Sequence, residues 1–175
     1  SEAGGAGTVT AGLFYGGGNP SAVANNESWN GTSWTEVTDL NAAVRYLGGN
    51  GTSTAALQVA GSTGADVEQW DGSSWTEVND INNSRTTLDS VGTVTASVAF
   101  GGRSPGLDAS TESWDGTSWV EQSDLATARA RIKGGGTSSS SALGFGGTTD
   151  GGSTQVNGTE EWSGADFTIN SVTTS

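Results

Sequence analysis

The chain contains no cysteine and no histidine among its 175 residues. The first absence excludes disulfides, thiolate metal ligands and thiol nucleophiles. The second removes the commonest transition-metal ligand and the commonest general base. We therefore expect neither a cofactor nor a metal centre, and we expect a protein that is not an enzyme.

Basic residues and long apolar runs are also scarce. The chain has six basic and 19 acidic residues, and its net charge of −13 argues against a nucleic-acid partner. No apolar stretch approaches the roughly 20 residues of a membrane helix, so we expect no membrane insertion. Hydrophobic residues make up 32% of the chain, and such a low share with a high net charge is also typical of disordered proteins. The seven tryptophans favour a folded chain because they recur at regular places.

Four copies of one pattern run along the sequence. Each copy has a Gly-Thr pair, an apolar stretch ending in two small residues, then Glu-x-Trp and a second aromatic residue five positions later. The first Trp of each copy recurs at intervals of 41, 44 and 48 residues. Repeats of about 40–50 residues with short strands and glycine turns are typical of propeller blades. We predict an all-β fold, a β-propeller of about four four-stranded antiparallel blades in a single domain 1–175, with blades at about 1–40, 41–81, 82–125 and 126–175.

In the second repeat we predict strands over residues 45–47, 54–59, 67–70 and 75–78. Asn30-Gly31 and its equivalents join the third strand to the fourth, and such dipeptides favour two-residue type I′ turns. That turn would pair Trp29 with Thr32 and place both tryptophans of a repeat on one face, against the Ser/Thr face of the neighbouring blade. The tryptophans expected to form the core are Trp29, Trp34, Trp70, Trp75, Trp114, Trp119 and Trp162.

The repeat resembles a known family. A Gly pair after an apolar strand, then Glu-x-aromatic and a further Trp, is similar to the Kelch repeat. The positions that carry the resemblance are Gly16-Gly17/Glu27/Trp29/Trp34, Ala60-Gly61/Glu68/Trp70/Trp75, Gly101-Gly102/Glu112/Trp114/Trp119 and Gly146-Gly147/Glu160/Trp162. Ala60 replaces a glycine, and Phe167 stands in place of the last Trp.

The heptapeptide sequence Gly-Thr-Ser-Trp-Thr-Glu-Val is most similar to the repeat sequences of Kelch-type propeller proteins encoded by marine tailed bacteriophages. That resemblance implies a non-enzymatic structural or binding protein located in a virion or outside cells, such as a capsid decoration or a tail-fibre module. Its partners would be other virion or surface proteins, or glycans, in a symmetric assembly. A secreted carbohydrate-binding propeller (a lectin or adhesin) of a marine microbe is the alternative. An enzyme is disfavoured because twelve of the 19 acidic residues recur at repeat positions, whereas catalytic carboxylates form a unique pair.

Candidate binding residues lie in the connections of variable length, 18–26, 62–66, 103–111 and 148–159, because loops on a rigid frame commonly carry function. Within them we select Arg103, Asp108 and Asp150. A second group, Arg129, Arg131 and Lys133, alternates along one segment and holds half of the basic residues.

Arg45, Arg85 and Arg129 occupy equivalent repeat positions. They either form a positive ring at the mouth of the propeller channel or pair with the recurrent acidic residues. The first repeat also begins late, because only seven residues precede Thr8. We therefore expect its inner strand to lack its start. Either a longer chain or a neighbouring subunit supplies the missing part, or the strand is simply short.

Overall fold

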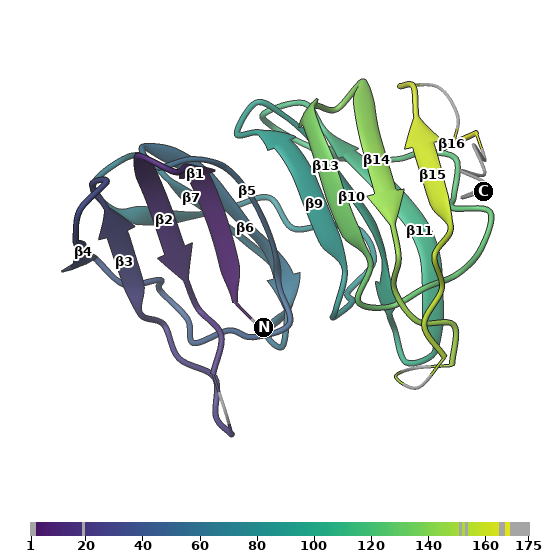
Figure 1. Cartoon of the computed structure of the whole chain (residues 1–175), viewed down its shortest axis with the longest axis horizontal. Coiled ribbons are helices and arrows are strands. Elements are labelled where there is room, and N and C mark those ends of the chain that lie inside the picture. The colour runs from purple at the N-terminus through teal and green to yellow at the C-terminus, as the bar shows by residue number, and fades with distance from the viewer. Residues whose placement is uncertain (1–2, 19, 151, 153, 165–166, 169–175) are drawn as a thin grey trace.

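The computed structural model describes residues 3–18, 20–150, 152, 154–164 and 167–168. Residues 169–175 of the predicted fourth blade lie outside this part of the chain. The described residues form strands and turns without a helix, and thus without one long and apolar enough to cross a membrane. Four antiparallel sheets of four strands each are arranged as the blades of a β-propeller (Figure 1), which confirms the predicted fold class.

Each blade is a simple meander in which neighbouring strands follow one another along the chain. Blade one contains β1 (Gly4–Thr8), β2 (Ala11–Tyr15), β3 (Asn26–Trp29) and β4 (Trp34–Val37). Blade two contains β5 (Gly48–Thr52), β6 (Ala55–Gly61), β7 (Gly64–Trp70) and β8 (Trp75–Val78). Blade three contains β9 (Asp89–Thr93), β10 (Ala96–Arg103), β11 (Leu107–Trp114) and β12 (Trp119–Glu121). Blade four contains β13 (Lys133–Ser138), β14 (Ser141–Phe145), β15 (Thr159–Trp162) and β16 (Phe167–Thr168).

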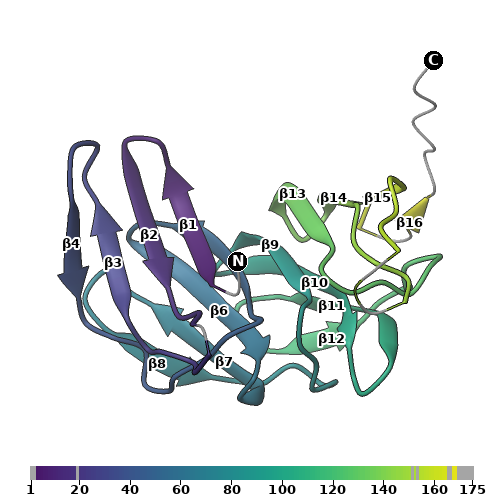
Figure 2. The same cartoon turned by 60° about the horizontal axis from the view of Figure 1, so that its bottom comes forward.

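The innermost strands contact one another in chain order. β1 packs beside β5, β5 beside β9, and β9 beside β13. Blades one and four stand apart at the two ends of this row, with blades two and three between them (Figure 2). The described residues therefore build three junctions between blades, and β1 and β13 do not pack together as the other inner strands do.

The inner strands lie further along the chain than predicted. The first strand of blade two begins at Gly48, so the strand predicted over 45–47 is wrong. Glycine weakens isolated strands, but it also permits a close approach of backbones. A Cβ on Gly49 would lie 2.5 Å from the Tyr15 hydroxyl and 3.1 Å from Cα of Gly4. The crowding at the axis therefore explains why residues with a low intrinsic preference for strands form them here.

Blade one has a complete inner strand, so the prediction that its start is missing is wrong. β1 is five residues long, as are β5 and β9, and it pairs with β2 over its whole length. What the later blades have in addition is the linker that precedes each of them. Leu40, Val44 and Leu47 of the first linker are buried between blades one and two.

The hairpin between the third and fourth strands differs from the predicted type I′ turn. Trp29 pairs with Trp34 across a four-residue connection. The Oδ1 atom of Asn30 accepts hydrogen bonds from the backbone N–H groups of Thr32, at 2.9 Å, and Ser33, at 3.0 Å. This side chain closes the turn in place of a second left-handed residue. Both tryptophans still share one face, and their ring centroids lie 5.4 Å apart in blade one.

The tryptophan pair of one blade packs against the preceding blade. Trp70 and Trp75 are buried in one cluster with Leu13 and Tyr15, and the Trp75 and Tyr15 rings lie 4.8 Å apart. The partner surface is thus apolar rather than the predicted Ser/Thr face. The two later clusters repeat this arrangement: Trp114 and Trp119 with Leu57 and Val59, then Trp162 with Val98 and Phe100.

Candidate functional site

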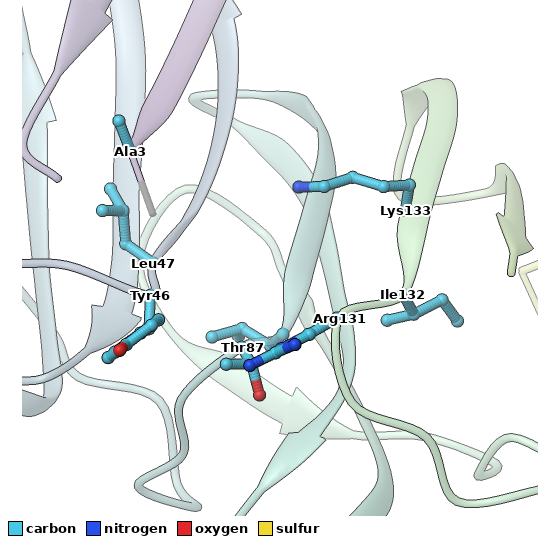
Figure 3. A pocket seen from close by; sticks show the side chains of 8 residues that line it. Ala3, Tyr46, Leu47, Thr87, Arg131, Ile132 and Lys133 are labelled. Carbon is cyan, nitrogen blue, oxygen red and sulfur yellow. The ribbon is translucent and has the colours of Figure 1, made fainter. Parts of the chain in front are cut away.

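A cavity of about 410 Å³ lies at the axis, where all four blades contribute to its wall (Figure 3). We call it the axial cavity. The side chains that line it are Ala3, Tyr46, Leu47, Thr87, Leu88, Arg131, Ile132 and Lys133. Its volume falls within the range of about 300–1,000 Å³ usual for small-molecule sites.

Three lining residues occupy the same position in successive repeats and share an unusual backbone. Tyr46, Thr87 and Arg131 have φ angles of 62°, 57° and 55°. The left-handed conformation costs roughly 1–2 kcal/mol for an L-residue. It allows the N–H of Thr87 to donate to the carbonyl of Tyr46 at 2.7 Å, and the N–H of Arg131 to that of Thr87 at 2.8 Å. These bonds join blades two, three and four around the axis.

The cavity wall of blade four is cationic. Arg131 and Lys133 are exposed, and Lys133 extends toward the wall formed by Leu47 and Ala3 (Figure 3). The Nζ atom of Lys133 lies 3.6 Å from Oδ1 of Asp89, whose other oxygen accepts the N–H of Gly134 at 2.7 Å. Burial raises the pKa of Asp89 above its ordinary value, and Lys133 opposes that shift. Arg131 forms no ion pair with a described residue, so this wall carries net positive charge.

Sequence reasoning selected Arg131 and Lys133, and it missed Tyr46 and Thr87. A signal for the missed residues was present in the sequence, because Tyr46 and Thr87 directly precede the buried aliphatic residues Leu47 and Leu88 of their linkers, just as Arg131 precedes Ile132.

Of the two interpretations of the equivalent arginines, the positive ring is wrong for Arg85 and Arg129, which are buried. Nη1 of Arg85 donates to Oε1 of Glu112 at 3.0 Å, and Arg129 forms an ion pair with Glu160. The alternative interpretation, pairing with recurrent acids, is therefore confirmed for these two arginines. Arg129 is consequently not available as a contact residue.

Arg45 differs from its two equivalents. It is half-buried, its guanidinium donates to the carbonyl of Pro20, and it lies 4.9 Å from the centroid of the Tyr46 ring.

The recurrent glutamates bind the linkers that precede their own blades. Glu68 accepts hydrogen bonds from the backbone N–H of Asn41 at 2.9 Å and of Ala42 at 3.2 Å. Glu112 does the same for Asn82, at 2.6 Å, and Glu160 for Ala126, at 2.7 Å. These carboxylates therefore have a structural role, because each one holds the backbone of the preceding linker against its own blade.

The other predicted binding residues are not brought together at the axial cavity. Residues 103–111 lie largely within β11, and Asp108 accepts a hydrogen bond from Nδ2 of Asn83 at 2.9 Å. The backbone of Arg103 pairs with that of Thr86. Asp150 closes its own loop by accepting the hydroxyl of Thr154 at 2.7 Å. Two of the predicted variable loops, 62–66 and 103–111, are thus mainly strand and tight turn.

Two further surfaces stand out because their apolar side chains are exposed. The first-blade face consists of Phe14, Trp29 and Trp34, and it is the equivalent of the tryptophan faces that blades two and three bury. Trp34 is 51% exposed and Phe14 is 43% exposed, so the prediction that Trp34 belongs to the core is wrong. Their rings contact each other edge to face, with centroids 6.5 Å apart.

The last-blade face contains Leu143 and Phe145, which are 44% and 42% exposed. Alignment of the repeats on the residue pairs 16–17, 60–61, 101–102 and 146–147 makes Phe145 the equivalent of Tyr15, Val59 and Phe100. All three equivalents are fully buried by the following blade. Blade four thus ends on the surface that, elsewhere in the chain, receives a tryptophan pair.

No protein-family model and no curated protein sequence matches the chain. The class of protein is set by its fold, a β-propeller of four antiparallel blades.

Proposed function

We propose that this protein is a non-enzymatic structural protein that functions through assembly, as a virion component of the capsid-decoration or tail-fibre kind. The observation that carries the proposal is the pair of exposed apolar faces at the two ends of the row of blades. Large contiguous apolar surfaces are uncommon on monomeric soluble proteins and mark sites of association. Trp34 and Phe145 belong to positions that the same chain buries in other blades.

The use of the recurrent carboxylates supports a structural function. Glu68, Glu112 and Glu160 are all buried, and each holds the linker of its blade. Residues held in hydrogen bonds of this kind position backbone rather than substrate. The Kelch-like wording of the repeat supports the virion assignment, and the net charge of −13 favours solubility of an exposed particle protein.

The test is to raise antibodies against the recombinant chain and to search for it in purified particles of tailed phages. We expect the chain to sediment with intact particles, at a copy number that matches a symmetry of the capsid or tail. Recovery of the chain only from the particle-free fraction, with no signal on the particles, would contradict the proposal.

A second candidate, binding of an acidic carbohydrate, is favoured by one observation. Arg131 and Lys133 line a cavity that also presents the Tyr46 ring, and an arginine can bind a carboxylate through two hydrogen bonds. A glycan array probed with the wild type and with Arg131→Ala/Lys133→Ala tests it. Binding of uronic or sialic acid glycans that the double variant loses, and that Arg103→Ala keeps, would favour this function.

A further inference from the structure

We propose that two copies of this chain join head to tail into a closed ring, with the first-blade face of each copy packed on the last-blade face of the other. The inference rests on the proposed function in assembly and names the partner, which is a second copy of the same chain.

The first argument is that the chain builds the same kind of junction three times, always in the same sense. A tryptophan face of the later blade covers the aliphatic and aromatic side chains of the earlier blade. In the first junction these residues are Trp75 and Tyr15, with ring centroids 4.8 Å apart. The junction is therefore directional, since its two halves are unlike.

The second argument is that the exposed faces are the two unlike halves of one more such junction. Trp34 is the equivalent of Trp75, and Phe145 is the equivalent of Tyr15. Each remains about half exposed, whereas Trp75 and Tyr15 are buried. A second copy supplies both complements, so that Trp34 of one copy would contact Phe145 of the other.

Closure within one chain fits the structure less well. Ala3 of blade one and Lys133 of blade four stand on opposite walls of the axial cavity, and β1 does not pack beside β13. To bring them together, the three existing junctions would have to change their angles, and the hydrogen bonds that link Tyr46, Thr87 and Arg131 run across two of these junctions.

The number of copies follows from the size of propellers. A contact between unlike faces produces a ring when its rotation closes. Propellers typically have about 4–8 blades. Two copies of four blades give eight, and three copies would give twelve, which is outside that range. The ring therefore contains two copies.

The experiment uses two variants that each destroy one face. Phe14→Glu/Trp34→Glu removes the first-blade face, and Leu143→Glu/Phe145→Glu removes the last-blade face. Val120→Glu is the matched control, because Val120 is also about half exposed but lies on β12 of blade three. Light scattering coupled to gel filtration gives the mass, and circular dichroism with thermal melting verifies that each variant is folded.

We expect the wild type and Val120→Glu to have twice the mass of one chain. Each face variant alone should be monomeric, with a dissociation constant at least about thirtyfold higher, as for interface hot spots. An equimolar mixture of the two face variants should recover a dimer, because one intact pair of unlike faces remains.

A wild type that is folded and monomeric at all concentrations would overturn the inference. So would a dimer of either face variant alone, since this would indicate contact between like faces. If a Glu variant does not fold, the double variant Trp34→Cys/Phe145→Cys is used instead. Its two cysteines are the only ones in the chain, so a thiol cross-linker reacts at these two positions alone. A short bis-maleimide should then give covalent dimers, and purely intramolecular products would contradict the ring. A monomer that still sediments with particles would end this inference and leave the proposed function in place.

Discussion

Nη1 of Arg85 donates to Oε1 of Glu112 over 3.0 Å, and neither side chain is exposed to solvent. Burial lowers the pKa of Arg85, and the carboxylate of Glu112 counteracts that shift. The same carboxylate accepts the N–H of Asn82, so one side chain connects the arginine, the linker and blade three.

Glu112→Gln should therefore lower the free energy of unfolding by about 3–5 kcal/mol, because it leaves a buried arginine without its counter-charge. Urea denaturation followed by tryptophan fluorescence measures the change. The matched control is Glu27→Gln, since Glu27 is the equivalent residue of blade one and is exposed; it should change stability by no more than about 0.5 kcal/mol. An equal decrease in unfolding free energy in the two variants would show that the buried ion pair contributes no more to stability than the exposed glutamate.

Trp75→Ala should cost about 3–5 kcal/mol, the usual penalty for removing a buried aromatic side chain, because it empties the junction with Tyr15. Trp34→Ala removes the equivalent ring from the exposed first-blade face and should cost clearly less when the chain is diluted to the monomer. Both values come from denaturant titration. If the two costs were the same, Trp34 would be as buried in the monomer as Trp75.

Gly49→Ala should destabilise the protein by about 1–3 kcal/mol, as overpacking commonly does. The new methyl group would lie against the Tyr15 hydroxyl and the backbone of Gly4. Gly106→Ala is the control, because a methyl group added there would meet no atom within 4 Å. The melting temperature should fall for the first variant and stay nearly constant for the second; a tolerated Gly49→Ala would mean that the inner strands can move apart.

The hairpin aspartates should make stability depend on pH in acid. The backbone N–H groups of Ser74 and Ser73 lower the pKa of Asp71, and Ser118 and Thr117 act in the same way on Asp115. A carboxyl group with a lowered pKa in the folded state contributes stability above its unfolded pKa, and this is lost as the pH falls through the folded value. Carbon-detected NMR titration should give pKa values below 3.8 for both residues.

Asn should replace these aspartates without loss of the turn, because Asn30 closes the equivalent hairpin of blade one. Asp71→Asn/Asp115→Asn is expected to flatten the acid limb of a plot of unfolding free energy against pH. An unchanged acid limb would assign the effect to other carboxyl groups.

The repeat pattern was sufficient to predict the propeller, the number of blades and the shared face of each tryptophan pair. Register was predicted incorrectly, because Asn30 replaces a two-residue turn with a side-chain-closed loop. The inner strands were misplaced for a related reason. Local preferences disfavour strands at Gly48 and Gly49, and only contact with the neighbouring blade makes glycine the residue that fits there.

The sequence by itself determined the repeat, the exclusion of thiol and imidazole chemistry, and the residues Arg131 and Lys133 as a cationic group, because composition and spacing are properties of the chain alone. Tertiary structure decided which equivalent residues have equivalent surroundings. Trp34 and Trp75 occupy the same repeat position, as do Phe145 and Tyr15, yet one of each pair is exposed. The physical reason is that burial in a propeller comes from the neighbouring blades, the preceding one for the tryptophan pair and the following one for the opposite face, and among the described residues an end blade has a neighbour on one side only.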